Sequence, residues 1–191
     1  MSIGEELAAV ILIEDPLRDE APSVIRKLKE VGFENVVMMT GDSDRTARSV
    51  AEKTGVTRYF SEVLPEDKAE FIRKEHEAGR KVIMIGDGIN DSPALSEADA
   101  GIAVSTGASI AREIADITIS SDDLGALLTL RSLSTELMRR INLNYNSIIG
   151  FNSFLIIMGM LGIFTPTTTA FLHNASTIAL SMKSMTNLLD D

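Results

Sequence analysis

Short apolar runs alternate with amphipathic stretches over the first two thirds of the chain. The apolar runs have the length and β-branched content of buried strands; they lie at residues 7–13, 36–40, 59–60, 82–85, 100–104 and 117–119. Stretches with the spacing of helices separate them, at residues 21–31, 44–53, 65–78, 92–98 and 108–115. Strands and helices that alternate in this way predict an α/β fold, with a parallel sheet and right-handed crossovers.

The last third of the chain has a different character. A long helical pattern starts near Leu124, and residues 145–164 are 20 consecutive positions without a charged side chain. About 20 residues are needed to cross a bilayer. Residues 167–189 are a weaker second candidate, because they contain His173 and Lys183. The pattern predicts a hairpin of two membrane spans, and the alternative is a pair of core helices in a soluble protein.

Charge divides the chain at about the same place. Residues 132–191 carry three basic and three acidic side chains, so the whole net charge of −10 lies in residues 1–131. An acidic surface argues against nucleic acid as a partner. The chain has no cysteine, which excludes disulfides and thiolate metal sites within it. Arg139 and Arg140 precede the first apolar stretch and predict a multi-pass membrane protein whose acidic part is cytoplasmic.

Residues 82–95, VIMIGDGINDSPAL, are the most informative segment. A predicted strand runs into a turn with two glycines, and a Ser-Pro pair then suits the start of a helix. Asp87, Asn90 and Asp91 therefore follow the carboxyl end of a strand, the edge at which open α/β sheets bind ligands. Closely spaced oxygen ligands suit Mg²⁺. We expect Asp87 to hold this ion, with Asn90 and Asp91 orienting the groups around it.

Two other loops leave strand ends with polar side chains. Thr40, Gly41 and Asp42 follow one predicted strand, and Lys68 lies at the start of the helix after another. Each loop alone is an ordinary turn or helix cap. Together with the 82–95 segment they supply a hydroxyl, an ammonium group and carboxylates, as phosphoryl transfer requires. We expect Thr40 to donate a hydrogen bond to a phosphoryl oxygen and Lys68 to neutralise the phosphoryl charge.

Three segments, in family order, resemble the phosphorylation-domain signatures of P-type ATPases, the cation pumps of the haloacid dehalogenase superfamily. They are MMTGD at 38–42, PEDK at 65–68 and MIGDGINDSPAL at 84–95. Residues 15–18, DPLR, are similar to the D-x-x-R stretch that follows the nucleotide-binding domain of these pumps. The resemblance covers nearly the whole chain, and it implies a partial Rossmann-like sheet of the haloacid dehalogenase type in residues 1–123.

The resemblance also implies a chemistry. P-type ATPases use ATP and Mg²⁺, form an aspartyl-phosphate intermediate and transport cations. By the family pattern Thr40, Asp42 and Lys68 contact the phosphate. Asp87 is then the main Mg²⁺ ligand, with Asp91 beside it.

Residues 124–191 resemble the end of the heavy-metal class of these pumps, in which two spans follow the phosphorylation domain. Phe151-Asn152 is similar to a Tyr-Asn pair of the penultimate span, and residues 173–177, HNAST, to a His-Glu-Gly-Ser-Thr stretch of the last span. Asn152, His173 and Ser176 are therefore candidates for contact with a transported transition-metal cation. Hydrogen bonding between helices is the alternative role. Both stretches depart from the pattern, so the transported metal stays open.

The family's phosphorylated aspartate, in a string such as DKTGT, is absent from the sequence. We therefore expect the chain to act with the remainder of a pump, namely the nucleotide-binding and actuator domains and the first six spans. The strand that bears the nucleophile is central to the sheet in this superfamily, so its flanking strands are expected to have unpaired edges. The isolated chain is expected to be poorly stable and to form no phosphoenzyme.

Two other functions remain open. A soluble haloacid dehalogenase-type phosphatase needs an amino-terminal D-x-D motif and no spans, and the sequence fits neither requirement. A non-catalytic membrane remnant or regulatory partner retains the Mg²⁺ residues without turnover, and the missing nucleophile favours it for the chain acting alone. Co-purification with a chain that carries the nucleophile would distinguish a split pump from a remnant.

Overall fold

The computed structural model describes residues 2–3, 6–7, 17–86, 90–104, 114–119 and 123–188. The chain divides into two compact units, Met1–Ala126 and Leu127–Asp191. Every described strand belongs to the first unit, and the second unit is helical.

The strands of the first unit pair in parallel, except for a short amino-terminal hairpin of β1 (Ser2–Ile3) and β2 (Glu6–Leu7). One parallel sheet pairs β3 (Val37–Met39) with β4 (Arg58–Phe60). The other contains β5 (Ile83–Gly86), β6 (Ala100–Val104) and β7 (Ile117–Ile119), in that order. The predicted parallel α/β fold is confirmed. Of the predicted strand at 7–13, only Leu7 lies in a described strand, and residues 8–13 lie outside the described part of the chain.

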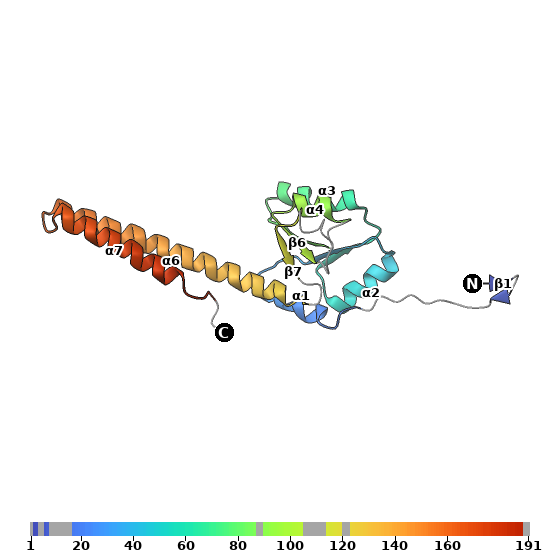
Figure 1. Ribbon diagram of the computed structural model, residues 1–191. Coiled ribbons are helices and arrows are strands. Elements are labelled where there is room, and N and C mark those ends of the chain that lie inside the picture. The colour runs from blue at the N-terminus through green and yellow to red at the C-terminus, as the bar shows by residue number, and fades with distance from the viewer. Residues whose placement is uncertain are drawn as a thin grey trace. The chain divides into compact units, whose positions relative to one another are not determined.

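The described helices of the first unit alternate with its parallel strands, and capping groups mark some of the helix ends. They are α1 (Ala21–Glu30), α2 (Asp44–Thr54), α3 (Pro65–Glu77) and α4 (Ser92–Glu97). Gly55 ends α2 with a left-handed φ of 74°, and the Asp67 carboxylate accepts a hydrogen bond from the Leu64 N–H at the start of α3. Figure 1 shows α3 and α4 on one side of β6 and β7, and α1 and α2 on the other. Most of the predicted helix at 108–115 lies outside the described residues.

The described parallel strands form two sheets, whereas the sequence predicts one. Among the described residues, β3 pairs only with β4, and β5 only with β6, so each has one edge without a neighbouring strand. No other described strand forms backbone hydrogen bonds with these two edges. An unpaired edge leaves a row of N–H and C=O groups available, so β3 and β5 can each accept one more strand.

Three side-chain pairs, the α3 ion pairs, connect α3 with the segment around α4. They are Lys68–Asp91, Arg73–Glu97 and His76–Asp99, with N···O distances of 2.6, 3.1 and 2.9 Å. Ile72 of α3 and Leu95 of α4 are almost completely buried. Because α3 follows β4 and α4 follows β5, this helix packing joins the two sheets into one unit.

Asp99 is the acceptor with the most partners among the α3 ion pairs. Its carboxylate accepts hydrogen bonds from Lys81 Nζ (2.7 Å) and the Val82 N–H (2.9 Å) as well as from His76 Nε2. The Lys81 ammonium, followed by the N–H donors of Val82 and His76, holds the pKa of Asp99 well below its usual range. These bonds fix the start of β5 against the start of β6.

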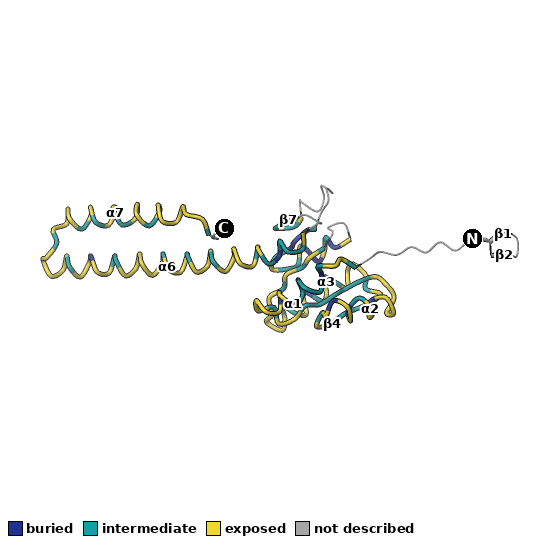
Figure 2. The backbone as a smooth tube through the Cα atoms, turned by 90° about the horizontal axis from the view of Figure 1, so that it is seen from below, coloured by how far each residue is buried: buried dark blue, intermediate teal, exposed yellow. Residues whose placement is uncertain are grey.

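The second unit is a hairpin of α6 (Ala126–Met160) and α7 (Pro166–Ser184), which lie side by side in Figures 1 and 2. Gly162 has a left-handed φ of 71° in the turn between them. Thr165 then caps α7, because its hydroxyl oxygen accepts a hydrogen bond from the Thr168 N–H.

The open end of the hairpin is closed by Arg140 of α6. Its guanidinium donates to the backbone carbonyls at and beyond the end of α7, those of Ser184, Thr186 and Asn187. Asn144 Nδ2 also donates to Ser184 Oγ (2.7 Å). Carbonyls at a helix end have no partner within the helix, so Arg140 satisfies groups that would otherwise need water.

No helix in the described residues combines the length and the apolar character that crossing a membrane requires. The prediction that α6 and α7 are membrane spans is therefore not confirmed. The physical reason lies in uncharged polar side chains. Asn146 and Asn152 interrupt the apolar stretch of α6, and α7 contains four threonines together with His173 and Asn174.

A methyl group at Gly101 of β6 tests the packing of β6 against α4. A Cβ there would lie 2.7 Å from the Leu95 carbonyl oxygen, a backbone atom that can move only with the helix. We expect Gly101→Ala to lower the free energy of unfolding by about 1–3 kcal/mol, measured by urea unfolding. Gly41→Ala is the matched control, because its nearest neighbour would lie at 3.8 Å. Equal stability of the two variants would contradict the described packing.

The lowered pKa of Asp99 predicts how stability depends on acid. A carboxyl whose folded-state pKa is depressed contributes stability above its ordinary value of about 3.9, and this contribution is lost as the pH falls below that value. We expect Asp99→Asn to unfold at lower urea concentration than the unaltered chain at about pH 5, and the difference to narrow toward about pH 2. A difference that stays constant over this range would argue against the described contacts of Asp99.

Candidate phosphate site

The polar loops predicted from the sequence follow the carboxyl ends of β3, β4 and β5. Thr40 comes directly after β3, and its N–H donates to the Phe60 carbonyl of β4 (3.0 Å). The loop after β4 is bonded to the loop after β3, because Glu62 N–H donates to the Asp42 carbonyl (2.9 Å) and Val63 N–H to the Thr40 carbonyl (3.0 Å). The backbone therefore holds these two loops together at one edge of the β3–β4 sheet.

Glu62 adopts a left-handed φ of 54°, the one such value among the described residues that are not glycine. Left-handed backbone is costly for a residue with a Cβ. The N–H groups of Glu62 and Val63 donate to the carbonyls of Asp42 and Thr40, and these two bonds hold the backbone at this position. Sequence analysis did not single out Glu62, because a lone glutamate in a loop carries no conformational signal.

Thr40 and Asp42 form a small hydrogen-bonded unit. The Thr40 hydroxyl donates to Asp42 Oδ2 (2.9 Å), and Thr40 Oγ1 accepts from the Asp42 N–H (3.1 Å). Asp42 is exposed and Thr40 is partly buried. The Thr40 hydroxyl is thus oriented by Asp42, and it has to turn from Asp42 before it can donate to another acceptor.

Lys68 and Asp91 form a nearly buried ion pair. Lys68 Nζ lies 2.6 Å from Asp91 Oδ1, and the two side chains are only 15% and 12% exposed. Lys68 belongs to the first turns of α3, and Asp91 directly precedes α4. The structure therefore brings together two residues that the sequence assigned to one site. A charge-assisted hydrogen bond of this length fixes both groups.

The expected metal side of the site is incomplete in the described part of the chain. Asp87, which we expected to be the main Mg²⁺ ligand, lies outside the described residues. Asp91, expected beside the ion, has one carboxylate oxygen bonded to Lys68 Nζ, and its place beside the ion stays a prediction. Asn90 is exposed next to it. No group of three or more histidine, aspartate or glutamate side chains among the residues described could hold a metal ion.

Gly86, the last residue of β5, is a part of the site that the sequence analysis did not identify. A Cβ at this position would lie 2.7 Å from Asp91 Cβ and 2.8 Å from Asp91 Cγ. The strand-to-turn position suggested a glycine chosen for backbone freedom, but Gly86 is not among the glycines with positive φ. The Asp91 side chain occupies the space beside Gly86.

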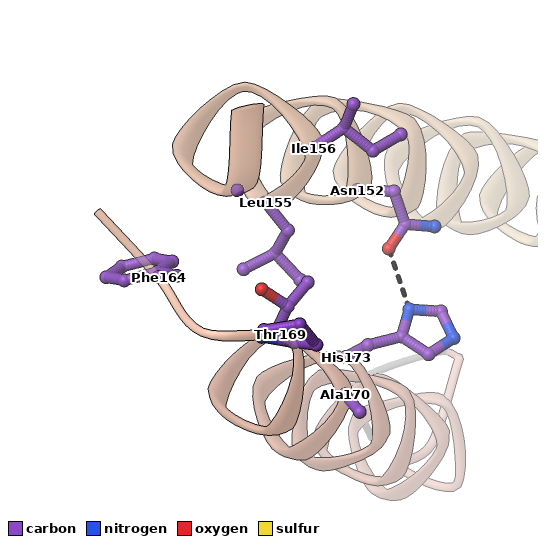
Figure 3. Close-up of a pocket in the computed structure, with 9 residues that line it drawn as sticks. Asn152, Leu155, Ile156, Phe164, Thr169, Ala170 and His173 are labelled. Atoms are coloured by element: carbon purple, nitrogen blue, oxygen red, sulfur yellow. Dashed lines mark hydrogen bonds between the residues drawn. The ribbon is translucent and has the colours of Figure 1, made fainter. Parts of the chain in front are cut away.

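The candidates for contact with a transported cation lie on the hairpin. Figure 3 shows His173 of α7 and Asn152 of α6 facing each other, with His173 Nδ1 donating to Asn152 Oδ1 over 2.9 Å. Ser176 is oriented differently, since its hydroxyl donates to the His173 carbonyl of its own helix (2.7 Å). The pair borders a groove of 690 Å³ lined by Asn152, Leu155, Ile156, Gly159, Phe164, Pro166, Thr169, Ala170 and His173.

Two family models match the chain, both described as haloacid dehalogenase-like hydrolase. They cover residues 2–99 and residues 70–129. The first match alone spans the β1 to α4 region, which contains Thr40, Lys68 and Asp91.

Among curated proteins, the chain is similar to a zinc-exporting P-type ATPase of Mycobacterium marinum, with 40% identity over 185 residues. It is also similar to copper-transporting ATPase 2 of Rhizobium meliloti, with 42% identity over 185 residues. Each match covers 96% of this chain but only 25% and 22% of the relatives, so the chain spans about a quarter of their length.

A solved structure extends the similarity through both units. The crystal structure of a zinc-transporting PIB-type ATPase in the E2.Pi state matches with a TM-score of 0.83 and 28% identity, over 90% of this chain and 28% of that one. The chain belongs to the haloacid dehalogenase-like family, and over nearly its whole length it is similar to about a quarter of each of the heavy-metal P-type ATPases named above.

Proposed function

We propose that this chain supplies the phosphate-contacting loops and the last helix pair of an ATP-driven transporter for a transition-metal cation. The observation that carries the proposal is the Lys68–Asp91 ion pair, formed between the start of α3, which follows β4, and the loop that follows β5. In this proposal residues 1–123 are part of the phosphorylation domain, and residues 124–191 are the linker helix and the carboxyl-terminal hairpin. Because the relatives are named for zinc and copper, the proposal names the cation only by class.

The proposed chemistry assigns a role to each loop. Lys68 neutralises the oxygens of a transferred phosphoryl group, Thr40 donates to one of them, and Asp42 orients the Thr40 hydroxyl. Asn90 contributes an amide beside Asp91. Mg²⁺, when bound at Asp87, would supply the remaining charge neutralisation. In the proposal, the domain that binds ATP and the aspartate that is phosphorylated belong to parts of the protein outside this sequence.

The open strand edges support the same proposal. β3 and β5 each have one edge without a partner among the described strands, and Ile83 and Ile85 of β5 are 44% and 39% exposed. A strand that pairs with these edges would satisfy the open backbone groups and cover apolar surface. It would also end at the sheet edge where Lys68 lies, as the strand bearing the nucleophile must.

The surface of the hairpin supports an association with the remainder of the pump. Large apolar side chains along α6 and α7 are more than half exposed, among them Ile156, Ile157, Met160, Phe171 and Ile178. Contiguous apolar surface is rare on free soluble proteins. In the proposal the other helices of the pump cover the hairpin within its membrane part, where polar side chains such as Asn152 face neighbouring helices, and the α/β unit is cytoplasmic.

The competing functions fit less well. A soluble phosphatase gives no reason for a hairpin that leaves apolar side chains exposed, or for a structural match to a metal-transporting ATPase over 90% of the chain. A remnant without turnover keeps the fold but does not need the Lys68–Asp91 geometry.

A chimera tests the proposed role of Lys68. This chain would replace the matching quarter of the Mycobacterium marinum zinc-exporting ATPase, and acid-stable phosphoenzyme and metal-stimulated ATP hydrolysis would be measured with zinc, copper and manganese. We expect an active chimera, and a loss of about 10²–10³-fold in turnover for Lys68→Ala, because one stabilising group is removed from the developing charge. Lys74→Ala is the matched control, since Lys74 is an exposed lysine of the same helix, paired with Glu70. An inactive chimera, or equal activity of the two variants, would contradict the proposal.

The same chimera tests the His173–Asn152 pair as a contact for the transported cation. Because Nδ1 of His173 donates to Asn152, Nε2 is the nitrogen with a free lone pair. We expect His173→Ala to reduce metal stimulation at least about tenfold and Asn152→Ala to reduce it less. Ser176→Ala should have little effect, because its hydroxyl is bonded within α7. Full metal stimulation in the His173 variant would mean that the pair serves helix packing and does not contact the cation.

A further inference from the structure

The space at Gly86 is filled by a charged side chain. A Cβ on Gly86 would lie closest to the Asp91 carboxylate oxygen Oδ2, and within 3.0 Å of Asp91 Cβ and Cγ. Real Cβ atoms do not approach other heavy atoms this closely, so any residue larger than glycine forces Asp91 to move. The carboxylate of Asp91 thus lies directly against the backbone of β5.

Asp91 has little freedom on its other sides. Its backbone carbonyl accepts the hydrogen bond from the Leu95 N–H (2.8 Å) that opens α4, and the residue is 8% exposed. Its second carboxylate oxygen, Oδ1, holds Lys68 Nζ at 2.6 Å. The ammonium group of Lys68 is therefore placed by a chain of contacts that begins at Gly86 and passes through Asp91.

We propose that Gly86 is a positioning residue for Lys68: its missing side chain makes the space in which the Asp91 carboxylate lies, and the carboxylate fixes the Lys68 ammonium. In the context of the proposed function, on which this part rests, Asp91 acts through Lys68. Replacing Gly86 by alanine would displace the carboxylate and leave a nearly buried ammonium group without its partner, which is unfavourable.

The test measures how fast the Lys68 amine reacts in the full 191-residue chain. An amine in a nearly buried ion pair is protected from acylating reagents, whereas exposed Lys74 is an internal reference on the same helix. Labelling with a limiting amount of acetic anhydride, followed by peptide mass spectrometry, gives the Lys68 to Lys74 rate ratio. We expect Gly86→Ala and Asp91→Gly each to raise this ratio at least about fivefold.

A double variant makes the mechanism specific. Asp91→Gly removes the carboxylate and the Asp91 Cβ, which are the atoms that a side chain at position 86 would meet, and glycine is tolerated at a helix start. We therefore expect Gly86→Ala to have no further effect in the Asp91→Gly chain. Gly55→Ala is the control for general destabilisation, because it places a Cβ at the left-handed end of α2, where φ is 74°; it should leave the ratio unchanged.

Several outcomes would overturn the inference. An unchanged Lys68 to Lys74 rate ratio in a folded Gly86→Ala chain would do so. A ratio in the double variant that equals the product of the two single effects would also overturn it. If Gly86→Ala prevents folding, as judged by circular dichroism, the inference requires the double variant to fold, and its failure to fold would reject it. Labelling involves neither ATP, metal nor the remainder of the pump. An unchanged labelling ratio would therefore not affect the conclusion from the chimera. An inactive chimera would likewise not affect the conclusion from labelling.

Discussion

The first unit depends on the packing of α3 against the segment around α4. Its parallel strands belong to two sheets with no strand pairing between them among the described residues, so hydrogen bonds between strands do not hold these two sheets together. Buried Ile72 and Leu95 and the three α3 ion pairs do so instead. Two of these pairs, Arg73–Glu97 and His76–Asp99, are partly exposed and contribute little each. Lys68–Asp91 is nearly buried, so one contact serves both the candidate site and the cohesion of the unit.

The sequence was sufficient to predict the order of strands and helices in the first unit, because apolar periodicity reports which positions are buried. It also predicted that Thr40, Lys68 and Asp91 follow strand ends. The partner of each charged group could not be predicted in this way. The bond between Lys68 and Asp91 was not predicted, because it depends on the distance between segments that are far apart in sequence. The role of Gly86 is also invisible in the sequence, where a glycine that makes room resembles a glycine that allows a turn.

The hairpin shows a different limit of sequence patterns. The expectation of membrane spans counted charged residues, and residues 145–164 contain none. Amides and hydroxyls are uncharged but still costly in hydrocarbon, and Asn146, Asn152 and the threonines of α7 reduce the apolar character of both helices. One of these polar side chains, Asn152, also joins the two helices, because it accepts a hydrogen bond from His173. Helices built in this way are suited to contact with other helices on several sides.

The bonds of Arg140 have a mechanical consequence for the hairpin. The Arg140 guanidinium on α6 donates hydrogen bonds to the carbonyls of Ser184, Thr186 and Asn187. The turn at Gly162 joins the helices at their other end. Sliding α7 along α6 by a single residue is a displacement of about 1.5 Å, which is enough to break all three bonds together. The two helices are therefore connected at both ends. Translation of one helix along the other would have to break these hydrogen bonds, whereas a tilt or rotation of the pair as one rigid body leaves every bond intact.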